Sequence, residues 1–424
     1  MTVQRQSSVD PRDPVSFLSG APEDHIVKGL YTILRSNWFP ILWLVVILGV
    51  TLVPLEATDE APPILCVLCG DGALADGVLN AALFLPLGAA LSVAGWRPWR
   101  TIALGALLSC GVETAQLVIP GRDPSLSDAL FNTLGTALGV VLARSASTWW
   151  RPGSRLAQVL SISGSIGTTS VLALTGVLLG ASFPNATYYG GWTPRFGHLE
   201  WYGGRLLEAS LDGLEVPSGV AARSAEIRQL LLSGATIQVR ARAGPRPPRL
   251  APLLTIHDRH QRVILLLGVD GDDFVYRYRT RAIAYGLVGS EIRVVGALRG
   301  IASGDSFSII VRQAPPGHCV RVNATEHCGL GYTVGIGWAL LLGGQPIAPW
   351  QKSVLNVLWL AALFFPTGLW ARFSRPFVAI AAFPLGSLLI LPATVGLLPT
   401  PWVELLGASV GFLAGWASST RHGP

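Results

Sequence analysis

The sequence is poor in charge and almost without lysine. Only 13% of its 424 residues are charged, against about 25% in an average soluble protein, and half are hydrophobic. This composition excludes an ordinary soluble globular protein and indicates a polytopic membrane protein. Lys28 and Lys352 are the only lysines, so the net charge of +6 comes from arginine. The arginines are spread over many loops, which argues against a nucleic-acid partner.

The N-terminal segment lacks the apolar core of a cleavable signal peptide, and its first 22 residues are polar and contain prolines. Residues 23–37 place Ile26, Leu30 and Ile33 on one helical face, which predicts a short interfacial helix. We therefore expect residues 1–37 to form a cytoplasmic tail that ends in this helix.

Apolar segments of membrane-spanning length then follow in two groups. We expect five transmembrane helices in residues 38–181 and three in residues 346–424, eight in all. The expected spans are 38–55, 76–95, 101–119, 128–147, 156–181, 354–371, 377–392 and 402–417.

Residues 182–345 differ from the rest because they hold most of the charged residues. Short runs of alternating apolar and polar residues are separated by turn signals, a pattern typical of an all-β antiparallel sandwich. The clearest expected strands are 236–243, 251–258, 262–269, 274–280, 291–298 and 307–313. The sequence thus predicts a jelly-roll or concanavalin-like domain inserted between the fifth and sixth spans.

Arginines fall at every second turn between the expected spans, and the alternate short loops hold only Arg122. By the positive-inside rule, both termini are then cytoplasmic and the sandwich is extracytoplasmic, since long domains translocate regardless of charge. The preference for arginine over lysine is typical of GC-rich bacterial coding. We therefore expect a multi-pass protein of the bacterial inner (cytoplasmic) membrane.

Parts of the first four spans recur weakly in the last four. FLPLG at 84–88 returns as FFPTG at 364–368, and LGTALGVVLA at 134–143 returns as LGASVGFLAG at 406–415. This predicts two degenerate four-helix repeats. The alignment places Glu404 at the position of Asn132 and Thr400 at that of Asp128, so we expect the second repeat to be structural only.

Polar residues lie at helical offsets in the second, third and fourth spans. Members of each pair are three or four residues apart and so share one helix face. Ionisable groups within membrane segments are costly, and each is a candidate functional residue. The set, which we expect in the outer half of the bilayer, is Asp76, Asn80, Glu113, Gln116, Arg122, Asp128 and Asn132.

Two interpretations of this set remain open. In the functional one, Glu113 and Asp128 are catalytic, as general base or divalent-metal ligand, Arg122 binds a phosphate or carboxylate, and the remaining residues contact ligand. In the structural one, the amides join helices, and Asp76 and Asp128 are helix N-caps partnered by Arg122. The sequence names no cofactor.

The extracytoplasmic segments also contain pairs and clusters of reactive residues. Cys319 and Cys328 are nine residues apart and are expected to form a disulfide. Cys66 and Cys69 form either a small disulfide or a redox pair. Two turn clusters have metal-ligand chemistry but fit solvated hairpin turns better; they are His257, Asp258 and His260, and Asp270, Asp272 and Asp273.

Residues 76–143 resemble the VanZ-like family, named for a teicoplanin-resistance accessory protein. The resemblance is carried by the seven polar residues above together with Pro86, Gly88 and Gly135. The sandwich resembles laminin-G and concanavalin-like domains in its strand rhythm. The VanZ resemblance implies a role in the cell envelope and in tolerance to glycopeptide antibiotics, but no settled activity.

We therefore expect a membrane protein that binds or processes an outer-leaflet lipid-linked or glycan ligand, with the sandwich as recognition module. Its expected partners are the lipid bilayer and that ligand. The alternatives are a non-enzymatic envelope scaffold or interaction protein and, third, a transporter. The sequence does not decide whether a reaction is catalysed.

Overall fold

The computed structural model describes residues 38–54, 72–197, 199–343, 347–371 and 375–420. The expected N-terminal tail, the interfacial helix, Cys66 and Cys69 lie outside these ranges. Contacts divide the chain into two units. The first contains helix α2 and Gly77–Ala146, and the second contains Val67–Asp76 and Ser147–Pro424.

The first unit is helical, as the hydropathy pattern predicted. Its helices are α2 (Trp38–Thr51), α3 (Ala73–Val93, whose first turn belongs to the second unit), α4 (Pro98–Gln116) and α5 (Leu126–Arg144). Ile47 of α2 is buried against Phe84, Leu87 and Leu91 of α3. The Trp43 indole N–H also donates a hydrogen bond to the Leu83 carbonyl of α3, at 2.7 Å.

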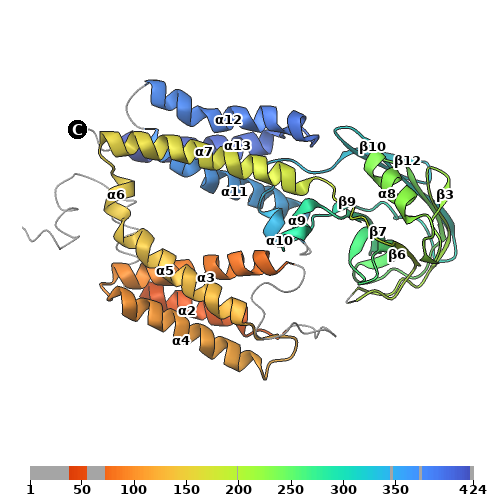
Figure 1. Ribbon diagram of the computed structural model, residues 1–424, viewed down its shortest axis with the longest axis horizontal. Coiled ribbons are helices and arrows are strands. Elements are labelled where there is room, and N and C mark those ends of the chain that lie inside the picture. Colours follow the sequence, from red (N-terminus) through yellow and green to blue (C-terminus); the bar gives the residue numbers. More distant parts are fainter. Residues whose placement is uncertain (1–37, 55–71, 198, 344–346, 372–374, 421–424) are drawn as a thin grey trace, which may run out of the picture. The chain divides into compact units, whose positions relative to one another are not determined.

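The second unit contains a helical bundle and two sheets (Figure 1). Its long helices are α7 (Ser154–Leu179), α11 (Pro349–Trp370), α12 (Arg375–Val395) and α13 (Trp402–Thr420). Helix α11 packs on α13 and α7, and α12 packs mainly on α7. Shorter helices are α6 (Ala146–Trp150), α8 (Ser224–Ser233), α9 (Arg281–Ala284) and α10 (Ala339–Leu342).

Four helices of the described ranges are long and apolar enough to cross a membrane: α3, α5, α7 and α11. Helix α2 and residues Ala382–Val395 of α12 are apolar but shorter. These helices indicate a membrane protein. The count of eight spans stays a prediction.

The sheets are antiparallel, and each has six strands. One has the order β4-β1-β6-β7-β8-β9 and the other β12-β11-β10-β5-β2-β3. The strands are β1 (Tyr189–Trp192), β2 (Arg205–Leu211), β3 (Leu214–Glu215), β4 (Gly219–Val220), β5 (Ile237–Arg242), β6 (Ala251–His257), β7 (Val263–Asp270), β8 (Asp273–Tyr278), β9 (Ile292–Val294), β10 (Ser306–Ala314), β11 (Gly317–Val322) and β12 (Thr325–Leu330). All six strands expected from the sequence are confirmed.

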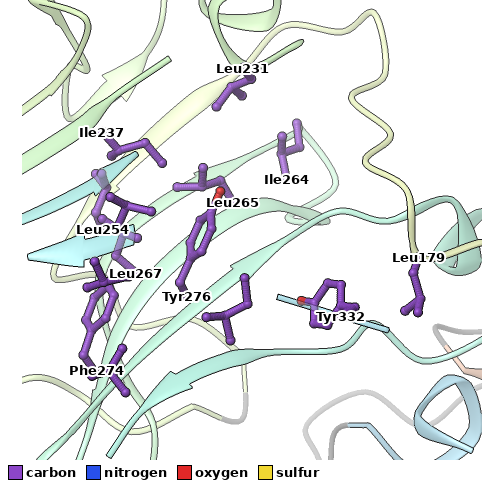
Figure 2. Packing of buried hydrophobic residues seen from close by; sticks show 14 of the residues in the cluster. Leu179, Leu231, Ile237, Leu254, Ile264, Leu265, Leu267, Phe274, Tyr276 and Tyr332 are labelled. Atoms are coloured by element: carbon purple, nitrogen blue, oxygen red, sulfur yellow. The ribbon is translucent and has the colours of Figure 1, made fainter. Parts of the chain in front are cut away.

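Alternation along the strands builds one core from both sheets. In β5 the side chains of Ile237, Val239 and Ala241 are buried, and those between them are exposed. Figure 2 shows Ile237 near Leu265 and Tyr276 of the other sheet, within one cluster of buried residues. Two antiparallel sheets around a common core agree with the predicted sandwich; the jelly-roll assignment stays a prediction.

The two units repeat the same helix contacts. Trp43 of α2 bonds the Leu83 carbonyl of α3, and the Thr168 hydroxyl of α7 bonds the Leu363 carbonyl of α11, at 3.1 Å. The following side chain is fully buried in both cases, as Phe84 and Phe364. Helices α2 and α3 therefore correspond to α7 and α11.

Three glycine contacts fix the register of the second helix pair. In each, a glycine lies so close to the neighbouring backbone that a Cβ atom would clash. The matched contacts are Gly88–Thr136 with Gly368–Phe412, Gly135–Ala81 with Gly411–Ala361, and Gly139–Leu85 with Gly415–Phe365. In this register Glu404 corresponds to Asp128, and Ala408 to Asn132. The alignment drawn from sequence was wrong by one helical turn, because glycines at 407, 411 and 415 allow two superpositions.

Candidate functional site

Polar side chains of α4 and α5 face each other across the helix interface. Ser109 and Glu113 lie four residues apart on α4, and Asp128 and Asn132 four apart on α5, so each pair shares a face. The Asn132 Nδ2 group donates to Ser109 Oγ at 2.8 Å. Asp128 lies one turn before Asn132 on the same face of α5 and interacts electrostatically with Glu113. We refer to these four residues as the polar ladder.

The ladder has an unsatisfied acceptor. Asn132 is only 2% exposed, and its Oδ1 atom has no hydrogen-bond partner among the described residues. A buried polar atom left without a partner costs roughly 1–3 kcal/mol. The neighbouring carboxylates are acceptors as well. The ladder is therefore suited to a cation or to a group that donates hydrogen bonds, such as a hydroxyl.

The start of α5 is capped by a serine. Ser125 Oγ accepts from the Ser127 N–H at 3.1 Å, and the Ser125 N–H itself donates to Glu113 Oε2 at 2.7 Å. Asp128 lies in the first turn of α5, and Asp76 in the first turn of α3. The proposal that both aspartates are N-caps was wrong, since each helix begins before its aspartate. Both aspartates still lie near the N-terminus of their helix, where the positive end of the helix dipole stabilises a negative charge.

Gln116 and Arg122 hold the C-terminal end of α2. Gln116 Nε2 donates to the Thr51 carbonyl at 2.9 Å, and Arg122 donates to the carbonyls of Val50 at 2.7 Å and Val53 at 2.9 Å. The last carbonyls of a helix lack intrahelical donors and favour a cation. These two side chains thus complete α2 and fix the loop before α5 beside it.

The remaining candidates lie on α3. Asn80 is half-buried within the first unit, and Asp76 groups with the second unit. The structure therefore brings Glu113, Asp128 and Asn132 together and gives Gln116 and Arg122 a structural contact.

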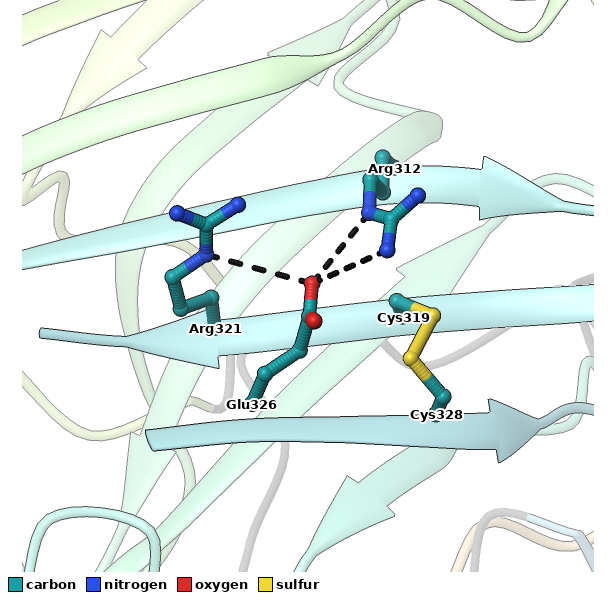
Figure 3. The surroundings of a disulfide bond; sticks show 5 residues. All are labelled: Arg312, Cys319, Arg321, Glu326 and Cys328. Carbon is teal, nitrogen blue, oxygen red and sulfur yellow. Dashed lines mark hydrogen bonds and ion pairs between the residues drawn. A yellow bond between two sulfur atoms is a disulfide. The ribbon is translucent and has the colours of Figure 1, made fainter. Parts of the chain in front are cut away.

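Cys319 and Cys328 form a disulfide between neighbouring strands β11 and β12 (Figure 3). Glu326 lies beside it and accepts from Arg312 at 3.1 Å, with Arg321 at 3.9 Å. Among the described residues, this is the one group of cysteines and acids close enough to hold a metal. Because both sulfurs are joined in the disulfide, it is a cross-link.

The two turn clusters of the sandwich bind arginines. Asp258 accepts from the backbone N–H groups of His260 and Arg262 and from the Arg262 guanidinium. Burial acts to raise the pKa of Asp258, but these donors hold it below its usual range. Asp270 and Asp273 pair with Arg293, and Asp272 pairs with Arg246. These contacts agree with structured turns.

Residues 29–149 match the family model described as VanZ/LLP1. This part of the chain is similar to that family. The match confirms the resemblance drawn from the polar positions; it contains the whole ladder and ends before α7. No curated protein and no solved structure matches the chain. The likeness of the sandwich to laminin-G domains thus stays an expectation.

Sequence reasoning missed two serines of this site. Ser109 is the partner of Asn132, and Ser125 links the start of α5 to Glu113. The position of Ser109, one turn before Glu113 on the same face, was a usable signal. Nothing in the sequence pairs Ser125 with Glu113, because that contact depends on the path of the loop.

Proposed function

We propose that the protein is a cell-envelope membrane protein that binds an outer-leaflet lipid-linked or glycan ligand through the polar ladder. The observation that carries the proposal is the buried Oδ1 atom of Asn132, which lacks a donor. The carboxylates of Glu113 and Asp128 add further acceptors nearby. A sugar hydroxyl would donate to the Asn132 Oδ1 atom, and a hydrogen bond from a second hydroxyl to one of the charged acceptors contributes about 1.5–3 kcal/mol.

The same residues support a catalytic version of this function. Glu113 would act as general base on a hydroxyl or water held by Asp128 and Asn132, in a hydrolysis or transfer reaction at a phosphate-linked lipid. Similarity to the VanZ/LLP1 family links the protein by analogy to glycopeptide tolerance. Turnover that is lost in Glu113→Gln would distinguish this version from binding alone.

The proposed location is the bacterial inner membrane, with both termini cytoplasmic and the sandwich outside. Loop arginines support this orientation through the positive-inside rule. The Cys319–Cys328 disulfide supports it independently, because disulfides persist in oxidising compartments.

A non-enzymatic scaffold is the second candidate. It is favoured by the contacts of Gln116 and Arg122, which hold the end of α2. In that case the ladder joins α4 to α5 and binds nothing else.

The test compares Asn132→Leu with Ser109→Ala. Both remove the hydrogen bond between α4 and α5, but Ser109→Ala keeps the Oδ1 acceptor. Native mass spectrometry of protein purified from its own membrane should show a glycolipid or polyprenyl species in wild type and in Ser109→Ala. We expect its occupancy to fall about tenfold in Asn132→Leu. Equal retention in both variants would favour the scaffold.

A further inference from the structure

A cavity of about 750 Å³ lies on the sandwich, next to strands β7 and β8 and the turn between β6 and β7. Its volume is in the range of ligand-binding pockets. Four arginines line it: Arg259, Arg262, Arg277 and Arg279. Another part of the cavity wall is apolar and is formed by Leu199, Leu266 and Leu287.

Two of the four arginines are neutralised by acids. Arg262 Nε contacts Asp258 Oδ2 at 2.9 Å, and Arg277 Nη2 contacts Glu291 Oε2 at 2.7 Å. Burial acts to raise the pKa of Glu291, but Arg277 and Arg293 hold it below its usual range. Both acids are therefore ionised at neutral pH, and these pairs leave no net charge.

The other two arginines have no acidic partner. Arg259 Nε donates to an imidazole nitrogen of His260 at 2.9 Å, a neutral acceptor. No ion pair or side-chain hydrogen bond joins Arg279 to the part of the chain that the structure describes. The cavity thus carries two positive charges that no carboxylate balances, on side chains whose planar donors suit phosphate.

A buried hydroxyl lines the same cavity. Ser290 is 5% exposed, and its Oγ atom has no hydrogen-bond partner in the described ranges. Leaving such a group without a partner is unfavourable. The Oγ atom lies 3.3 Å from the position of a Cβ at Gly343, a residue that does not line this cavity, so Ser290 is part of the wall and is not counted as a ligand contact.

We propose that this cavity binds the phosphate group of an anionic amphiphile. The guanidinium groups of Arg259 and Arg279 contact phosphate oxygens. The apolar wall takes the hydrocarbon next to the phosphate. This site shares no residue with the polar ladder, so either can fail without the other.

The test uses the full-length protein in a non-ionic detergent and two soluble probes, hexyl phosphate and inorganic phosphate, titrated by calorimetry. The double variant Arg259→Gln/Arg279→Gln should bind hexyl phosphate about a hundredfold more weakly than wild type, since each charged hydrogen bond contributes about tenfold or more.

The matched control is Arg240→Gln/Arg312→Gln, which removes two arginines from the other sheet and should bind like wild type. Unfolding temperatures of all variants verify folding. Equal binding of hexyl phosphate by the two double variants would contradict the proposal that this cavity is the binding site. Equal affinity of wild type for both probes would mean that the cavity binds free phosphate, and would contradict the proposal of an amphiphilic ligand.

Discussion

The helix pair α3–α5 and the helix pair α11–α13 are joined by the same contacts but differ in chemistry. In both pairs, glycines at matching positions bring one backbone directly against the other. Small residues allow this close approach between membrane helices. The polar ladder, however, joins α5 of the first pair to α4 and has no counterpart among the described residues of the second pair, where Ala408 occupies the position of Asn132.

The second pair contains one acidic residue, Glu404, and its side chain is buried. Glu404 is 1% exposed, and its Oε1 atom accepts from the Thr333 hydroxyl at 2.5 Å and from Asn356 Nδ2 at 3.5 Å. Thr333 follows the last strand of the sandwich, whose exit segment thus reaches this helix pair. The position that carries Asp128 in the first pair is used here to anchor the sandwich.

The third helix explains why only one pair has a ladder. Helix α4 packs on α5 and supplies Ser109 and Glu113, whereas α12 packs mainly on α7. Glycine packing thus fixes the position of each helix pair, and the neighbouring helix determines which polar groups face it.

The largest effect is expected from the shared glycines. A leucine side chain at Gly139 would clash with the carbonyl oxygen of Leu85, and one at Gly415 would clash with that of Phe365. We expect each variant to lose about 3 kcal/mol or more, or not to fold, as measured by thermal unfolding in detergent. Gly111→Leu in α4 and Gly386→Leu in α12 are the controls, because no atom lies within 4 Å of a Cβ there. Equal stability of Gly139→Leu and Gly111→Leu would show that the close glycine contacts do not hold the helix pairs together.

A smaller effect is expected from the matched hydrogen bonds to α3 and α11. Trp43→Phe and Thr168→Val each remove one bond to an equivalent carbonyl. Each should lower the free energy of unfolding by about 1 kcal/mol, with further loss for the smaller ring in Trp43→Phe. Denaturant titration measures this. No loss in either variant would mean that these bonds do not contribute to the repeat.

Much of this architecture was predictable from the sequence. Apolar runs located the long helices, and alternation located six strands, because both signals arise from burial on one face. The register of the repeat was not predictable, since glycines four residues apart at 407, 411 and 415 permit a slip of one turn. Packing between backbones decides the register, and that is visible only in three dimensions.

The candidate site was predictable in part. Glu113, Asp128 and Asn132 were marked by their polarity within apolar helices. Gln116 carried the same signal, and Arg122 stood out as the charged residue of a short loop, but their partners are backbone carbonyls at the end of α2, which a sequence does not show. The arginine-lined cavity also could not be foreseen, because its side chains come from separate turns and strands.

The most direct test of the account compares two corresponding acids, Asp128 and Glu404. Native mass spectrometry of Asp128→Asn and Glu404→Gln, purified alongside wild type from its own membrane, measures occupancy by the co-purifying glycolipid or polyprenyl species. We expect Glu404→Gln to keep this species and Asp128→Asn to lose it about tenfold, while both variants remain folded. Loss in Glu404→Gln with full retention in Asp128→Asn would contradict this expectation, because the ligand would then depend on the second helix pair.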